Sequence, residues 1–192
     1  MWADEKRNCT IHAKQVRYIS HISKNNEQPF SLLGRGGGPW VGLFTFINII
    51  SFVFRYVYCR QCDLSSQKSI KEFVEAFKKK ETRIDGLINN AGIYHAPRSV
   101  SEDGIEIHFA VNHLGHFLLT NLLMDMIKDS GPGNRVVFLM NLDYRKGQVV
   151  LDDLNFNQRV FSKTDAFNQS QLANMLLVQQ LSKLLKGKVF SW

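Results

Sequence analysis

The sequence predicts an α/β protein built on a doubly wound parallel sheet. Short apolar runs alternate with amphipathic helical segments along the chain. The runs lack the polar alternation of a half-exposed strand, which is typical of strands buried on both faces. The chain has 192 residues, 44% of them hydrophobic, and can bury one core, so a single domain is expected. Right-handed crossovers would place helices on both faces of the sheet.

The first expected elements lie between residues 53 and 91. β-Branched and aromatic residues from Val53 to Cys59 predict a strand that ends near Asp63. Ser65 or Ser66 is expected to cap a helix over residues 67–80, whose apolar residues recur at a spacing of three and four. The apolar run 84–91 then predicts a strand buried on both faces.

The second half repeats this order. A wide apolar face between Phe109 and Met126 predicts a long helix, which the turn residues 130–133 should stop. Residues 135–141 form the next apolar run and predict a strand. A last helix is expected over about 165–186, with Ser162 to Asp165 as its capping start.

The N-terminal part differs in character, and the predicted organisation is an atypical segment 1–58 followed by a domain over 59–188. Residues 1–35 are polar, and a glycine-rich joint at 34–39 follows. Residues 36–54 carry no charge, and the stretch 40–54 is dominated by Val, Leu, Phe and Ile. This stretch is just long enough to cross a bilayer, so one interpretation is a membrane segment or interfacial anchor. The other is that it forms buried strands or a poorly folded stretch.

Charge and cysteine content exclude several classes of function. Residues 63–192 hold sixteen Lys/Arg against fourteen Asp/Glu and show no basic stripe with interleaved aromatics, so no nucleic-acid partner is expected. Three cysteines argue against a disulfide framework and favour an intracellular, reducing compartment. Cys59 and Cys62 spell C-x-x-C without a second pair, and His113 and His116 lack partners at ligand spacing. No metal site is therefore expected.

Three motifs follow one another along the chain: Cys62-Asp63-Leu64, Asn89-Asn90-Ala91-Gly92 and Val111-Asn112-His113-Leu114-Gly115-His116-Phe117. Together they resemble the short-chain dehydrogenase/reductase family, and in particular its retinol dehydrogenase branch. The resemblance covers about residues 59–187. It implies a Rossmann-like fold that here is partial and truncated at both ends, and NADP or NAD as the family cofactor.

The resemblance also assigns cofactor-binding positions. An aspartate after a parallel strand lies at the carboxyl edge of the sheet, where its carboxylate can accept the exocyclic amine of an adenine. The family resemblance gives this role to Asp63, with Leu64 beside it. Asn90, Ala91 and Gly92 have small side chains or a turn-forming backbone that let a dinucleotide approach closely. Hydrogen bonds that tie strands together are an equally good explanation of the asparagines.

The catalytic positions are where this chain departs from the family. The resemblance gives Asn112 the place of an asparagine that holds a water in a proton relay, although a local helix kink explains it equally well. The family serine, tyrosine and lysine correspond to Asn141, Phe167 and Gln171. Phe167 has no proton to transfer and Gln171 has no charge to lower a tyrosine pKa, so these positions are predicted to be non-functional.

The ends of the chain depart as well. Residues 1–58 carry no Thr-Gly-x-x-x-Gly-x-Gly loop, whose backbone donors hold the pyrophosphate, so NADP or NAD is expected to bind weakly or not at all. Three interpretations remain: a non-catalytic family member, an active NAD(P)-dependent oxidoreductase on a retinoid or other lipophilic alcohol or carbonyl, and a non-functional truncated product. Expected partners are a second copy or a relative, paired through the long helices, and a membrane through residues 40–54.

Overall fold

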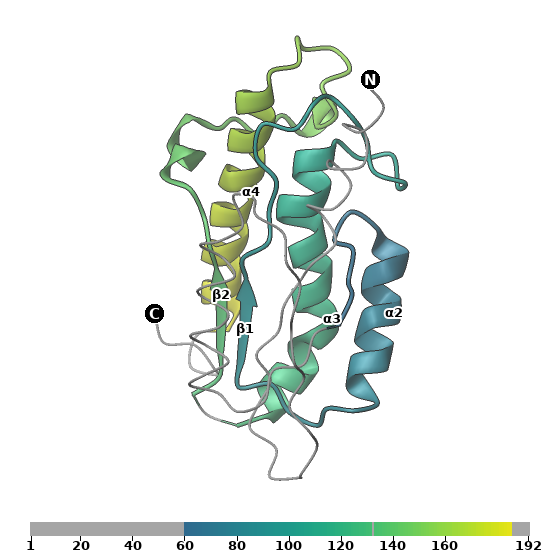
Figure 1. Ribbon diagram of the computed structural model, residues 1–192. Coiled ribbons are helices and arrows are strands. Elements are labelled where there is room, and N and C mark those ends of the chain that lie inside the picture. Colours follow the sequence, from purple (N-terminus) through teal and green to yellow (C-terminus); the bar gives the residue numbers. More distant parts are fainter. Residues whose placement is uncertain (1–59, 132, 186–192) are drawn as a thin grey trace, which may run out of the picture.

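The computed structural model describes residues 60–131 and 133–185 (Figure 1). Strands and helices alternate through this part, as the sequence predicts. In chain order the elements are α2 (Gln67–Lys78), β1 (Gly86–Asn89), the π-helical segment η1 (Phe109–Gly115), α3 (His116–Asp129), β2 (Arg135–Phe138), the 3-10 turns η2 (Leu142–Lys146) and η3 (Leu151–Asp153), and α4 (Lys163–Leu184). The stretch 40–54 and the boundary expected near residue 58 lie outside the described residues.

Helix α2 forms where the sequence predicts it. The Oγ of Ser66 accepts a hydrogen bond from the backbone N–H of Ser69 at 3.1 Å, which satisfies one of the open donors of the first turn. The apolar stripe is buried, and it consists of Ile70, Phe73, Val74 and Phe77. The strand expected to end near Asp63 is not continuous over residues 60–63, and the rest of that prediction lies outside the described residues.

Strands β1 and β2 are parallel neighbours, with Gly86 opposite Arg135 and Asn89 opposite Phe138. Both are shorter than the apolar runs 84–91 and 135–141 that predict them. At the start of β1 the reason is local, because the backbone N–H of Ile84 donates to the Oγ of Ser130 at 2.7 Å and not to a neighbouring strand.

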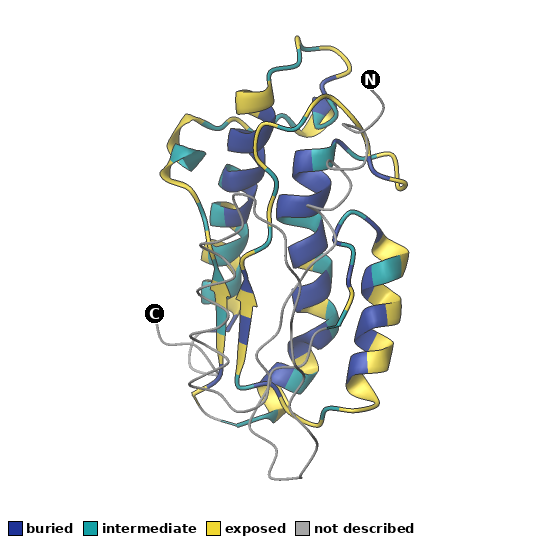
Figure 2. Cartoon of the chain, in the orientation of Figure 1, coloured by how far each residue is buried: buried dark blue, intermediate teal, exposed yellow. Residues whose placement is uncertain are grey.

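The two faces of this sheet differ. Asn89 is buried against α3, where its Nδ2 donates to the Oγ1 of Thr120 at 3.1 Å. Ile88 and Val137 face the other way and remain 45% and 42% exposed. Figure 2 shows exposed residues in both strands. Helix α4 packs beside η1, which runs directly into α3. The helices of residues 60–131 and 133–185 therefore lie on one face of the sheet, and the expected helices on its other face are not found among these residues.

The single long helix predicted after β1 consists of two parts, the π-helical η1 and the α-helical α3. Gly115 lies at their junction in close contact with the chain before α2: a Cβ at this position would stand 2.5 Å from the carbonyl oxygen of Leu64. The helix ends at Asp129, and the Oγ of Ser130 donates to the carbonyl oxygen of Met126 at 2.6 Å. Gly131 then adopts a positive φ of 104° and turns the chain, as the predicted stop signal requires.

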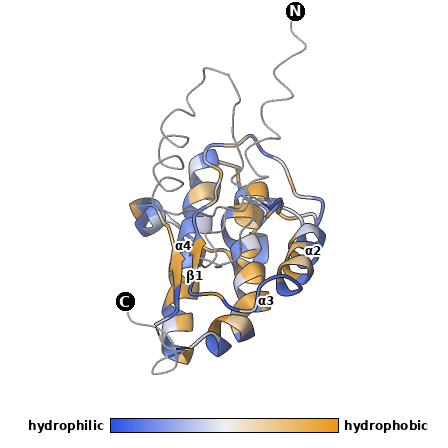
Figure 3. Ribbon diagram, turned by 60° about the horizontal axis from the view of Figure 1, so that its bottom comes forward, coloured by the Kyte–Doolittle hydropathy of each residue, from blue (hydrophilic) through white to orange (hydrophobic). Residues whose placement is uncertain are grey.

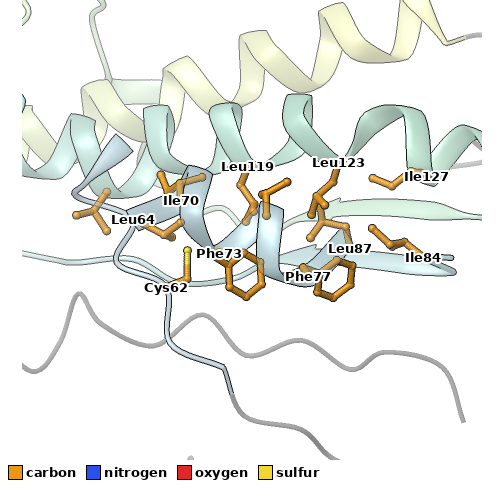
Figure 4. Close-up of a cluster of buried hydrophobic side chains, with 12 residues drawn as sticks. Cys62, Leu64, Ile70, Phe73, Phe77, Ile84, Leu87, Leu119, Leu123 and Ile127 are labelled. Carbon is orange, nitrogen blue, oxygen red and sulfur yellow. The ribbon is translucent and has the colours of Figure 1, made fainter. Parts of the chain in front are cut away.

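The core lies between α2, α3 and the sheet (Figure 4). Aliphatic and aromatic side chains from all three elements form it, and Cys62 joins them at 0% exposure. The cluster comprises Cys62, Leu64, Ile70, Phe73, Val74, Phe77, Ile84, Leu87, Val111, Leu119, Leu123 and Ile127.

Helix α4 begins as predicted, since the Oγ of Ser162 accepts from the backbone N–H of Asp165 at 3.3 Å. Its first half buries a run of polar side chains from Asn168 to Gln171. The ribbon coloured by hydropathy shows hydrophilic residues in α4 and hydrophobic residues in β1 (Figure 3). In the stretches 60–131 and 133–185, no helix combines the length and the apolar character that crossing a bilayer requires.

Candidate functional site

Asn112 is the centre of the candidate site and is 1% exposed. Its Oδ1 accepts from the backbone N–H of Ile93 at 2.8 Å, and its Nδ2 donates to the carbonyl oxygen of Ile93 at 3.0 Å. The same Nδ2 donates to the Oγ of Ser170 at 3.0 Å. One side chain therefore joins the loop after β1, the η1 segment and helix α4.

The π-helical geometry of η1 explains how the backbone of Asn112 takes part too. A widened turn leaves a carbonyl without its regular helical partner. Here the carbonyl oxygen of Asn112 accepts from Asn174 Nδ2 at 2.8 Å and from His116 Nδ1 at 2.9 Å. The local-kink explanation considered from the sequence thus has support, because Asn112 occupies an irregular turn and its side chain bonds backbone, whereas its role in holding a water stays a prediction.

Phe167 lies one turn before Gln171 on α4, next to the Asn112 network. Its ring is 8% exposed and meets the ring of Tyr94 edge to face, with centroids 4.7 Å apart. Its carbonyl oxygen accepts from the Oγ of Ser170 at 2.7 Å. The position that the family uses for a phenol is therefore an enclosed aromatic contact, and the phenyl group itself offers no proton.

Gln171 and Asn141 are bonded to each other. The Oε1 of Gln171 accepts from the backbone N–H of Asn141 at 2.9 Å, and Gln171 is 6% exposed. The Oδ1 of Asn141 accepts from the backbone N–H of Asp143 at 3.0 Å and caps η2. The Gln171 amide thus fixes the loop that follows β2 onto helix α4, and the Asn141 amide stabilises the turn within that loop.

The candidate cofactor residues gather at one end of α3. Gly92 lies against Asn112, since a Cβ on Gly92 would be 3.2 Å from the Asn112 Oδ1, and Leu64 lies against Gly115. These two contacts bring the chain around Asp63 and the loop after β1 to the same edge of the sheet. That is where nucleotides bind in open α/β folds.

The individual residues fit a dinucleotide unequally. Asn90 and Gly92 are exposed and Ala91 is half-buried, so this loop is open to a ligand. The Oδ1 of Asp63 accepts from both the N–H and the Oγ of Ser65, at 3.0 and 2.7 Å, and among residues 60–131 and 133–185 no hydrogen-bond donor is found on Oδ2, which could accept an amine. Leu64 is 2% exposed and belongs to the core, so its side chain does not face a ligand.

The two histidines of this segment are packing residues. Burial lowers the pKa of His116 to about 4, against the bond to the Asn112 carbonyl, which raises it. Burial also lowers the pKa of His113, whose Nδ1 lies 3.0 Å from the Oδ1 of Asn174. Within residues 60–131 and 133–185, no group of three His, Cys, Asp or Glu side chains is placed to hold a metal ion.

Sequence reasoning missed a buried hydrogen-bonded pair, Glu106 and His108, that positions the loop over the site. Glu106 Oε1 and His108 Nδ1 are 2.7 Å apart, and both residues are at most 1% exposed. The Nε2 of His108 accepts from the backbone N–H of Ala96 at 3.0 Å, so the pair holds the loop that carries Tyr94. Glu106 and His108 are two residues apart in the sequence, but His108 bonds Ala96, which is twelve residues away. No local sequence pattern predicts such a contact. Ser170 was missed for the same reason.

Comparisons with known proteins agree with the motifs. Residues 53–144 match the model of the short chain dehydrogenase family. Human retinol dehydrogenase 13 is 46% identical over 132 residues, which are 69% of this chain and 40% of that protein. The chain thus spans about two fifths of the length of this curated relative.

Solved structures agree at the level of the fold. A structure of an uncharacterised protein from Mycobacterium paratuberculosis superposes with a TM-score of 0.58 at 37% identity, covering 65% of this chain and 43% of that one. A protein described as a short chain dehydrogenase from Escherichia coli CFT073, complexed with NADPH, gives 0.53 at 19% identity, covering 77% and 58%. The first shows similarity in fold and in sequence, and the second supports the fold alone.

Proposed function

Because this chain is a retinol dehydrogenase-like member of the short-chain dehydrogenase/reductase family, we propose that it is a pseudoenzyme, a catalytically inactive relative that acts by association. The proposal rests on the structural roles that the side chains at the three substituted catalytic positions have in this chain. Asn141 caps a turn, Phe167 fills an aromatic contact and Gln171 binds a backbone N–H. None of these side chains can donate or accept a proton at neutral pH.

The size of the expected loss follows from the missing acid. General acid–base catalysis by a positioned side chain contributes on the order of 10² to 10⁴-fold. Tyr94 does carry a phenol close to Phe167, but it is 60% exposed and belongs to the loop after β1. In the family pattern a lysine ammonium one helical turn after the tyrosine lowers the phenol pKa, and the sequence gives Tyr94 no lysine at this spacing.

Weak cofactor binding is part of the same proposal. The open loop at Asn90 to Gly92 and the carboxylate of Asp63 suit a nucleotide, whose bound nicotinamide would supply the hydride chemistry of the family. Residues 1–58 carry no match to the glycine-rich loop that donates backbone N–H groups to a pyrophosphate. We expect NADP(H) or NAD(H) to bind no tighter than millimolar.

The partner in this proposal is a second copy of the chain or an active relative, paired through the long helices. Phe117 on α3 supports it, since this large apolar side chain is 41% exposed. The ring centroid of Phe117 also lies 6.2 Å from that of His113, and His113 bonds Asn174 of α4. Phe117 therefore lies next to the contact between η1 and α4.

The test is turnover and binding by the full chain. All-trans-retinal with NADPH, or retinol with NADP⁺, should give no change in nicotinamide absorbance above a heat-denatured control. Calorimetric titration with NADPH should show no micromolar binding, and limited proteolysis with and without NADP(H) should give the same resistant core. Turnover above background would refute inactivity, and micromolar affinity would refute weak binding.

A matched variant separates missing side chains from missing positioning. Asn141→Ser, Phe167→Tyr and Gln171→Lys together restore the family residues. We expect this triple variant to stay inactive, because hydride transfer also needs a nicotinamide held against the substrate, and orientation contributes effective molarities of about 10⁵ M or more. Activity of a triple variant that keeps the resistant core would show that residues 1–58 build a cofactor site.

A further inference from the structure

Two polar atoms are buried between helix α3 and the sheet, and within residues 60–131 and 133–185 they have no hydrogen-bond partner. They are the Oδ1 of Asn89 on β1 and the Nε2 of His116 on α3. Asn89 is 2% exposed and His116 is 3% exposed, so the solvent outside the protein reaches neither atom. A polar atom that gives up its bonds to water on folding is costly to leave without a new one. These two atoms therefore indicate that a partner is bound between α3 and β1.

Both atoms are hydrogen-bond acceptors. The amide oxygen of Asn89 can only accept. The Nδ1 of His116 donates to the carbonyl oxygen of Asn112 at 2.9 Å, so Nδ1 carries the proton of the neutral ring and Nε2 presents a lone pair. The neutral ring is the form present at neutral pH, because burial lowers the pKa of His116 to about 4. Two acceptors cannot bond to each other, so the group that satisfies them has to be a donor.

The two side chains share neighbours on both sides of this interface. The Nδ2 of Asn89 donates to the Oγ1 of Thr120 at 3.1 Å, and Thr120 lies one helical turn after His116 on α3. On the sheet, Phe138 is the register partner of Asn89, and its ring meets the His116 ring edge to face with centroids 6.3 Å apart. Side chains one helical turn apart stand about 5–6 Å from each other. A single oxygen can bridge such a separation, since two hydrogen bonds of about 2.8 Å each span roughly 5 Å.

Thr120 supplies a donor at the same place. Its Oγ1 accepts from Asn89, and in the part of the chain that the structure describes its hydroxyl hydrogen has no acceptor. Thr120 is 2% exposed, so the outer solvent does not take this hydrogen either. Helix α3 and strand β1 run side by side, and one donor and two acceptors are therefore left between them (Figure 1). A water molecule has the complementary set, with two hydrogens to donate and lone pairs to accept.

We infer that one water molecule is bound between α3 and β1, where it donates to the Asn89 Oδ1 and the His116 Nε2 and accepts from the Thr120 hydroxyl. Internal waters typically make about three hydrogen bonds, and these three satisfy every open atom of the cluster. A metal ion does not fit, because within residues 60–131 and 133–185 no group of three His, Cys, Asp or Glu side chains is placed to hold one. Through His116, the water links β1 to the Asn112 carbonyl, whether or not the chain turns over a substrate.

A crystal structure of the full chain, at a resolution that shows ordered waters, tests this directly and needs no substitution. The expected result is density for one water oxygen at hydrogen-bond distance, about 2.7–3.2 Å, from the Asn89 Oδ1, the His116 Nε2 and the Thr120 Oγ1. Density for another side chain bonded to these atoms, a direct bond between Asn89 and His116, a heavier ion, or no density between them would each overturn the inference.

Magnetic relaxation dispersion of ¹⁷O water provides a second measurement in solution, because it counts the long-lived internal waters of a protein. Asn89→Leu removes both amide atoms at a similar side-chain volume, so this variant should hold one long-lived water fewer than the wild type. Asn121→Leu is the matched control, since it makes the same substitution at an exposed position of α3 and should leave the count unchanged. An equal count in the wild type and in folded Asn89→Leu would contradict the inference. If Asn89→Leu does not fold, the crystal structure of the unmodified chain decides alone.

Discussion

Acidification should destabilise this protein through His116, which is held neutral at the centre of the candidate site. The Asn112 carbonyl oxygen can only accept, so the Nδ1 of His116 carries the proton of the neutral ring. Its Nε2 is buried and has no hydrogen-bond partner among residues 60–131 and 133–185. A second proton on this nitrogen would place a charge where the described residues offer no acceptor.

The magnitude follows from the two pKa values. Burial lowers the pKa of His116 from 6.5 to about 4. Between these values the unfolded chain binds a proton that the folded chain excludes, so stability is complete above about pH 6.5 and falls as the pH drops toward the folded value. One pKa unit corresponds to about 1.4 kcal/mol, so the loss at pH 4 is about 3 kcal/mol. That is a large share of the roughly 5–15 kcal/mol by which domains are stable.

Urea unfolding followed by far-UV circular dichroism measures this loss at neutral pH and at pH 4. Carboxylates also titrate in this range, so the informative quantity is the difference between the wild type and His116→Asn, which keeps a donor for the Asn112 carbonyl. His95→Asn is the matched control, because His95 is exposed and its positive φ of 54° suits asparagine. If the wild type and His116→Asn lose the same free energy on acidification, then His116 is not a buried neutral side chain.

Three further outcomes are expected. Gly115→Ala should lower the free energy of unfolding by about 2 kcal/mol or more, since its Cβ would stand 2.5 Å from the Leu64 oxygen. Gly86→Ala is the control, and it should cost less than half as much because the nearest atom to its Cβ is 3.8 Å away. Equal urea midpoints for the two variants would contradict this packing. Burial raises the pKa of Cys62 to about 12. In a variant with the other two cysteines replaced, Cys62 of the folded protein should therefore react with a disulfide reagent at least about a hundredfold more slowly than Cys62 of the protein unfolded in urea. Equal rates would count against burial. Phe117→Lys should weaken self-association through α3 in sedimentation, and an unchanged dimer would place the contact elsewhere.

Local signals predicted most of the described fold. Serine caps at Ser66 and Ser162 and the glycine turn at Gly131 act within a few residues of their helices, so a sequence pattern is enough to find them. Strand lengths were overestimated because apolar character continues where pairing stops, as at Ile84, whose N–H bonds a serine side chain.

The site was only partly predictable, because its bonds join distant parts of the chain. Asn112 could be singled out as a candidate, but its bond to Ser170 spans 58 residues. The π-helical turn around it was not predicted, and the Asn112 carbonyl accepts from Asn174, 62 residues later in the chain. The side chains at positions 141 and 171 were interpreted as losses of chemistry, and the bond from the backbone N–H of Asn141 to the Oε1 of Gln171 became evident only in three dimensions.

That bond leads to a final prediction about Gln171, because it makes a return to the family lysine costly. The amide oxygen of Gln171 accepts from the Asn141 N–H in a setting where the side chain is only 6% exposed. A lysine has no acceptor and would bring a charge into this position, so Gln171→Lys should lower the free energy of unfolding by about 1–3 kcal/mol. Gln171→Glu keeps an acceptor oxygen and should cost less at neutral pH. Urea unfolding of both variants tests this order. If lysine is the better tolerated of the two, the Gln171 side chain does not hold the loop after β2, and the structural role inferred for this position is wrong.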